Sequence, residues 1–87
     1  MLNAAVVGRV IQRIREEKNQ SQELVSGLAG IGRTHLSAIE RGERKPTLET
    51  FCRIAYALDM KPSALMQALS TRRSLFRNLV ALRPNSL

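Results

Sequence analysis

Two glycines flank a single apolar residue at Gly30-Ile31-Gly32, between two short runs whose apolar residues recur at helical spacing. Gly30 lacks a β-carbon, so it can adopt the left-handed conformation that ends one helix and lets the next begin at a steep angle. Ile31 would then fill the angle between the two helices, and Gly32 would be a weak N-cap for the second. The segment therefore predicts two short helices joined by a tight turn.

Apolar periodicity and capping residues predict five helices in the first 70 residues. They are expected over residues 3–17, 22–29 and 33–41, then from 48 to about 58, and finally from about 62 to 69. Gly27 costs the second of these helices about 1 kcal/mol relative to alanine. That helix is therefore expected to be held by packing through Leu24, Val25 and Leu28.

Composition agrees with one small helical domain and points to a polyanionic partner. The aromatic share of 3% leaves an aliphatic core, which favours helices over sheets. The formal net charge is +7, and residues 71–87 carry four arginines and no acidic residue. Such a balance indicates nucleic acid or an anionic membrane surface as the partner.

The sequence offers no constellation typical of an enzyme, a metal site or a secreted protein. Cys52 is the single cysteine and His35 the single histidine, so neither a disulfide nor a Cys/His zinc site can be assembled, and no metal or cofactor is expected. Gly8 and Arg9 interrupt the apolar stretch at residues 4–7, and no run is long enough to span a membrane. We expect a cytoplasmic protein that is not an enzyme.

Several segments in register resemble the xenobiotic-response-element family of helix-turn-helix regulators, which includes the phage repressor and Cro proteins. They are "SQEL" at 21–24, Ala29-Gly30-Ile31, "LSAIERG" at 36–42 and "KPTLETFCRIAYALDM" at 45–60, with Gly8, Ile11, Ile14 and Arg15 before them. The resemblance covers about residues 7–69. It implies an all-α, five-helix phage-repressor-like domain over residues 1–70, with an additional C-terminal helix in the basic segment 71–87.

The implied function is a sequence-specific DNA-binding transcriptional regulator, a repressor that binds a two-fold-symmetric operator as a homodimer. A helix in the major groove needs short or forked polar side chains near its N-terminus and a buried opposite face. Leu36 and Ile39 supply that inner face. The resemblance assigns contacts with DNA bases to Arg33, Thr34, Ser37 and Ala38.

Other residues are expected to position the protein on DNA or to hold the fold. The resemblance and the helix dipole assign contacts with the DNA backbone to Ser21, Gln22, Arg41, Arg44 and Lys45. For the last three, a solvated charged loop is the alternative. The resemblance to the phage repressors also implies a structural ion pair between Arg15 and Glu40.

The segment from Thr71 to Arg83 has an amphipathic pattern that is expected to make the dimer contact. Its candidate residues are Leu75, Phe76, Leu79 and Val80. Packing back on the same domain and a disordered basic tail are the alternatives. In function, an antitoxin or a restriction-modification controller with this fold, either with a small protein partner, remains open, as does a protein-interaction module that does not use DNA.

Overall fold

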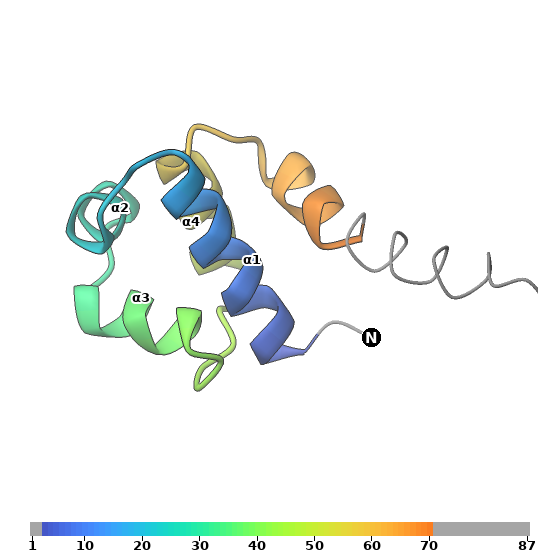
Figure 1. Ribbon diagram of the computed structural model, residues 1–87, viewed down its shortest axis with the longest axis horizontal. Helices are drawn as coiled ribbons and strands as arrows, with labels where there is room; N and C mark the ends of the chain where they lie inside the picture. The colour runs from blue at the N-terminus through green and yellow to red at the C-terminus, as the bar shows by residue number, and fades with distance from the viewer. Residues whose placement is uncertain (1–2, 71–87) are drawn as a thin grey trace, which may run out of the picture.

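The computed structural model describes residues 3–70, which form an all-α arrangement (Figure 1). Helix α1 spans Ala4–Glu17, α2 spans Gln22–Ala29, α3 spans Arg33–Glu40 and α4 spans Leu48–Ala57. Residues 62–70 are also helical, up to the end of the described part, and no strand occurs within residues 3–70. The predicted five-helix all-α fold is confirmed, whereas the additional C-terminal helix lies outside the described residues.

Three of the helices begin at a side chain that caps them. Asn3, Ser21 and Thr47 each accept a hydrogen bond from the backbone N–H three residues later, over 2.9, 3.0 and 3.1 Å. Such caps satisfy donors that have no partner within the helix. Helix α3 follows Gly32 and has no side-chain cap, as the sequence predicts for a glycine in that position.

The first four helices end with the same backbone motif. One or two residues after each helix end, the chain takes a left-handed conformation, with φ of 56° at Asn19, 70° at Gly30, 79° at Gly42 and 58° at Asp59. The next N–H then donates to a carbonyl five residues back, as Ile31 does to Ser26 and Glu43 to Ala38. This Schellman arrangement turns the chain sharply after each helix.

The core is aliphatic and lies where all the helices meet. Helix α2 packs on α3 and α4, and α1 packs on α3. The largest fully buried side chains are Ile11, Val25, Leu36, Ile39, Ile54, Leu58, Leu65 and Leu69.

The expected anchoring of α2 through three apolar residues is wrong in two of them. Val25 is fully buried, but 47% of Leu24 and 62% of Leu28 is exposed. The buried stripe of this short helix consists of Val25, Ser26 and Ala29, and the two leucines lie one position earlier, about 100° around the helix. Periodicity alone did not show which of these two neighbouring sides of the helix would be buried.

The backbone of helix α1 comes into direct contact with the backbone at the end of α3. A β-carbon at Gly8 would overlap the carbonyl oxygen of Ile39 and lie 2.8 Å from that of Glu40. A β-carbon at Gly42 would lie 2.9 Å from the α-carbon of Ala5. The C-terminal end of α3 is therefore fixed directly on α1.

Candidate nucleic-acid interface

One face of α3 is anchored and the other is open. Leu36 and Ile39 are fully buried, whereas Arg33 and Thr34 are exposed in its first turn. Ser37 is half-buried, and its hydroxyl accepts a hydrogen bond from Nη1 of Arg41. The structure thus brings three of the four predicted base-contacting residues to the outer side of a well-anchored helix.

Ala38 does not lie on this open face. It is only 8% exposed, so the expectation that it faces outward is wrong. Ala38 sits about 100° around the helix from Ser37, and its carbonyl accepts the N–H of Glu43 at 2.9 Å, where the chain turns back after α3. Helical periodicity does not predict that the chain turns back at this point after α3.

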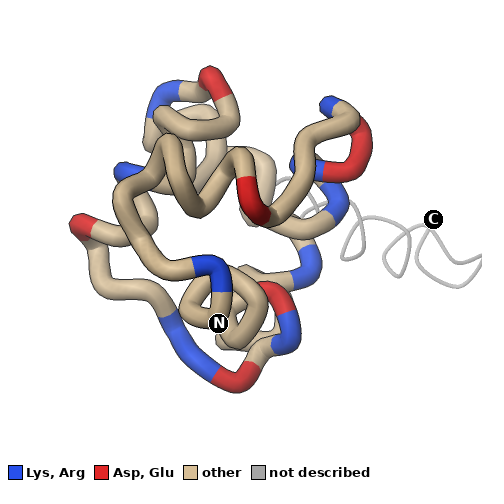
Figure 2. Tube along the Cα trace, turned by 90° about the vertical axis from the view of Figure 1, so that its left-hand side faces the viewer, with Lys and Arg blue, Asp and Glu red and all other residues tan. Residues whose placement is uncertain are grey.

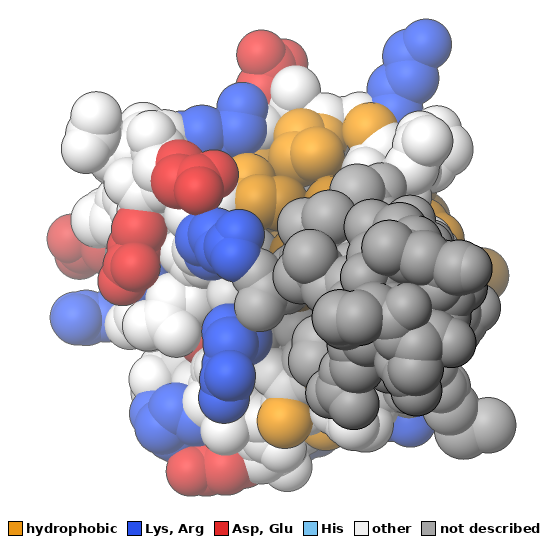
Figure 3. Space-filling model, turned by 45° about the vertical axis from the view of Figure 1, so that its right-hand side comes forward, with side chains coloured by type: hydrophobic (Ala, Val, Ile, Leu, Met, Phe, Trp, Pro, Cys, Tyr) orange, Lys and Arg blue, Asp and Glu red, His pale blue; other side chains and the backbone are white. Residues whose placement is uncertain are grey.

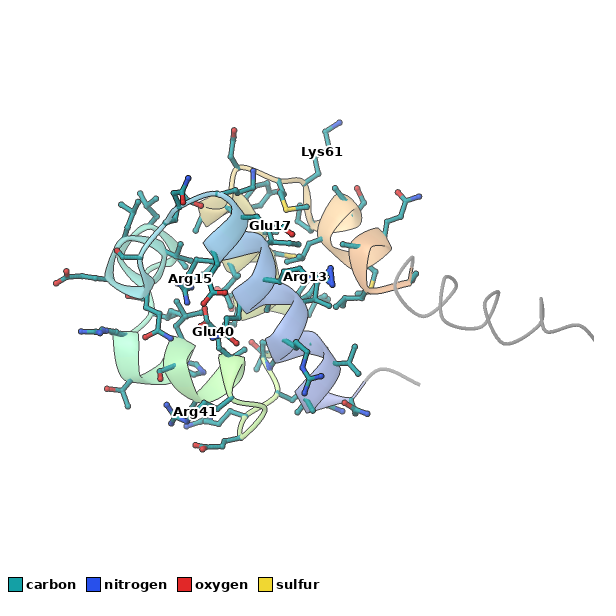
Figure 4. The ribbon with its side chains drawn as sticks, viewed as in Figure 1. Arg13, Arg15, Glu17, Glu40, Arg41 and Lys61 are labelled. Carbon is teal, nitrogen blue, oxygen red and sulfur yellow. The ribbon has the colours of Figure 1, made fainter. Side chains whose placement is uncertain are left out.

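A buried ion pair joins α1 to the end of α3. Nε and Nη2 of Arg15 donate to the two carboxylate oxygens of Glu40 at 2.7 and 3.0 Å, and Nη1 of Arg15 donates to the Gln20 carbonyl at 2.7 Å. The Arg15 and Glu40 side chains are 10% and 2% exposed, and they point toward one another in the middle of the molecule (Figure 4). Hydrogen bonding to Glu40 raises the pKa of Arg15 above its usual value, against the opposing effect of burial.

Gln22 also belongs to this network, and its contact with Glu40 was not predicted from the sequence. Its side-chain Nε2 donates to Oε1 of Glu40 at 2.9 Å, so the first residue of α2 is tied to the last residue of α3. The hydroxyl of Ser21 is likewise engaged, because it accepts the N–H of Leu24. Since Ser21 Oγ acts here as an acceptor, its hydroxyl proton remains available to a phosphate, as does the backbone at the start of α2.

The turn after α3 carries basic residues on both sides of an acidic one, as the bottom of Figure 2 shows. Arg41 donates from Nε and Nη2 to the two carboxylate oxygens of Glu43, at 2.9 and 3.0 Å. The hydrogen bonds and charge of Arg41 lower the pKa of Glu43, and Glu43 raises that of Arg41. Arg44 and Lys45 follow and are exposed.

The pairing of Arg41 with Glu43 was not predicted. Residues two apart do not face one another on a helix, and the pair forms only because the left-handed Gly42 turns the chain between them. Gly42 followed by an acidic residue at the end of a predicted helix was the available signal. Arg41 thus lies beside the open face of α3, and its guanidinium is bound to the Glu43 carboxylate.

A groove of about 400 Å³ lies between α1 and residues 62–70. Its lining residues are Val10, Arg13, Ile14, Glu17, Ala64, Gln67 and Ala68. On this side of the molecule, hydrophobic side chains lie beside charged ones (Figure 3). The predicted dimer residues Leu75, Phe76, Leu79 and Val80 lie outside the described residues, and within residues 3–70 no helix is long and apolar enough to cross a membrane.

Comparison with known proteins identifies relatives for most of the described part. The profile of the helix-turn-helix family matches residues 11–65. An uncharacterized HTH-type transcriptional regulator of Sinorhizobium fredii, y4dJ, is 42% identical over 53 residues, which is 61% of this chain and 69% of the relative. The control protein C.BamHI of Bacillus amyloliquefaciens is 37% identical over 60 residues, covering 68% of this chain and 74% of that protein.

Similar structures have also been solved. The restriction-modification controller protein C.Esp1396I, crystallised as a tetramer in complex with its natural 35 base-pair operator, superposes with a TM-score of 0.73. It is 29% identical in sequence, and the match covers 78% of this chain and 90% of that one. The arrangement of α1 to α4 described above is therefore shared with a protein that was crystallised on its operator.

Proposed function

The chain belongs to the helix-turn-helix family, and on that premise we propose that it is a sequence-specific DNA-binding transcriptional regulator, a repressor that acts as a homodimer. The observation that carries this proposal is the division of α3 into two faces. Leu36 and Ile39 hold the helix, and Arg33 and Thr34 extend from its first turn into solvent. A helix of this kind can enter the major groove without rearrangement of the core.

Arg33 and Thr34 are the proposed principal contacts with base edges. A guanidinium can donate two hydrogen bonds to O6 and N7 of guanine, which discriminates against other bases by about 1–3 kcal/mol. Ser37 can join them when its hydroxyl is released from Arg41. Ala38 is left out of this set because its side chain is buried.

Contacts with phosphates would hold α3 in register on the duplex. The proposed groups are the backbone at Ser21 and Gln22, where α2 begins, and the side chains of Arg41, Arg44 and Lys45 in the turn after α3. The N-terminus of a helix favours anions, and basic side chains that reach phosphates carry no sequence information of their own. Affinity and specificity would therefore depend on different residues.

A homodimer would place two α3 helices about 34 Å apart on successive turns of one DNA face. We propose residues 1–70 as the DNA-binding domain and residues 71–87 as the segment that links two copies, through Leu75, Phe76, Leu79 and Val80. The protein would work in the cytoplasm, without enzymatic activity or a cofactor.

A restriction-modification controller is the second candidate within the same function class. The 37% identity with C.BamHI and the likeness to C.Esp1396I favour it. Such a regulator would also bind operator DNA, so α3 would have the same role. A restriction endonuclease gene beside the coding sequence would distinguish this candidate from a general repressor, and a toxin gene there would instead favour an antitoxin.

Selection of bound sequences from random duplex DNA tests the proposal. A two-fold-symmetric consensus is expected, with affinity that falls steeply with salt, at a log–log slope of about −7 for about eight neutralised phosphates. Arg33→Ala should relax the preference at one base pair per half-site, whereas the control Lys45→Ala should weaken all sequences alike. Equal losses on operator and random DNA for Arg33→Ala would contradict base reading by α3.

A further inference from the structure

The guanidinium of Arg41, which lies in the proposed interface, is already hydrogen-bonded to neighbouring side chains. Its guanidinium makes two hydrogen bonds to the Glu43 carboxylate and a third to the hydroxyl of Ser37. About half of each charged side chain is exposed, 53% for Arg41 and 59% for Glu43. The pair therefore lies on the surface that a DNA duplex would approach, rather than inside the fold.

A bidentate carboxylate uses the same donors of arginine that a phosphate uses. The Nε–H and the Nη2–H that bind the two oxygens of Glu43 cannot bind a phosphate at the same time, and Ser37 holds a third of the five N–H donors of Arg41. Ser37 is affected as well, because its hydroxyl accepts from the same guanidinium. Glu43 thus restrains Arg41, the proposed phosphate-binding group, directly. Through Arg41 it also restrains Ser37, a proposed base-contacting group.

The backbone keeps Glu43 in this position. Gly42 is left-handed, its N–H donates to the Ile39 carbonyl, and the N–H of Glu43 donates to the Ala38 carbonyl. This turn brings Glu43 back beside the last turn of α3, within reach of Arg41. The other negative charge in the neighbourhood, Glu40, is neutralised inside the fold by Arg15.

From this arrangement we propose that Glu43 is an internal competitor for DNA phosphate, which holds Arg41 and Ser37 in the free protein and limits affinity. The inference rests on the proposed DNA-binding function and adds a regulatory residue to it. On binding, the guanidinium exchanges Glu43 for a phosphate oxygen and can then move away from Ser37, which frees an acceptor lone pair of that hydroxyl for a base. Affinity is thereby kept below what the basic turn alone would give.

Glu43→Gln removes the competing charge and keeps the size of the side chain. Exposed ion pairs shift equilibria by about 1.5- to 5-fold, so a dimer that opens two of them should bind the selected operator about 2- to 25-fold more tightly. Glu17→Gln is the matched control, because it removes the same charge from an exposed residue at the far end of α1 from Arg41 (Figure 4). Its affinity should change by less than about 1.5-fold at 0.15 M salt, where distant charges are screened.

A double variant separates competition for Arg41 from simple repulsion of DNA by Glu43. If Glu43 acts through Arg41, the gain from Glu43→Gln should disappear in an Arg41→Gln background. Equal gains in both backgrounds would overturn the proposal, as would a wild-type protein that binds its operator no less tightly than Glu43→Gln. Failure of wild type and all variants to bind any selected duplex, with unchanged thermal unfolding, would instead refute the proposed function.

Discussion

Replacing Arg15 by methionine tests the claim that the buried ion pair holds α3 in place. Methionine keeps the length and apolar stem of the side chain but leaves the Glu40 carboxylate, 2% exposed, with Gln22 as its remaining hydrogen-bond donor. Removing one partner of a buried pair costs about 3–5 kcal/mol. A domain of about 70 residues has a free energy of unfolding of only about 4–10 kcal/mol. Arg15→Met should therefore lose a third or more of the total stability.

Urea denaturation followed by circular dichroism measures this loss. Arg53→Met is the matched control, because Arg53 pairs with Glu49 on the exposed side of α4, and its cost should stay within about 0.5 kcal/mol. The double variant Arg15→Met/Glu40→Leu should recover most of the loss, since a buried pair can be replaced by apolar residues at little cost. A loss below 1 kcal/mol for Arg15→Met, or no recovery in the double variant, would refute the reasoning.

This contribution should not depend on pH near neutrality. The folded-state pKa of Arg15 is raised above its unfolded value, so the stabilisation is complete below the unfolded pKa and is lost only as the pH rises through the folded one. That window lies at strongly alkaline pH, because the pKa of an arginine is already very high before it is raised further. The Arg15 charge should therefore stabilise the wild-type protein equally at pH 6 and pH 9, as measured by its free energy of unfolding in urea.

Substitutions at three further positions test the backbone geometry by thermal unfolding. Gly8→Ala should destabilise the protein by at least about 2 kcal/mol, because the new β-carbon meets backbone carbonyls that cannot rotate away. Gly27→Ala is the contrasting case. A β-carbon there meets no atom within 4 Å, so this substitution should stabilise the protein by up to about 1 kcal/mol. A Gly8→Ala protein as stable as wild type would disprove the close contact between α1 and α3. Asp59→Gly should raise the midpoint by about 2–4 °C, since glycine relieves the left-handed strain, whereas Asp59→Ala should lower it. A lower midpoint for Asp59→Gly would show that the strain is not costly.

Local chemistry made much of this fold predictable. Ser21 and Thr47 cap the helices that follow them, and Gly30 takes the left-handed conformation expected of it. These features depend on a few neighbouring residues, so their physical cause is contained in a short stretch of sequence. The turn between α2 and α3 is the clearest case.

Three other features were missed for a different reason. The burial of Ala38, the link from Gln22 to Glu40 and the pairing of Arg41 with Glu43 all depend on contacts outside a single helix, either with another helix or with the turn at Gly42. Helical periodicity describes the direction of a side chain but not what covers or engages it. Function-bearing side chains at helix ends, where the chain turns, are therefore the ones a sequence describes least well.

The anchoring of α3 is concentrated at its inner face and its final turn, through Gly8, Arg15 and Gln22. Its first two residues, Arg33 and Thr34, are exposed and are not part of the core. Two positions can thus change identity with little effect on folding. Under the proposed function, duplicated copies of such a gene could acquire separate DNA target sites by substitution there, while inheriting the same scaffold.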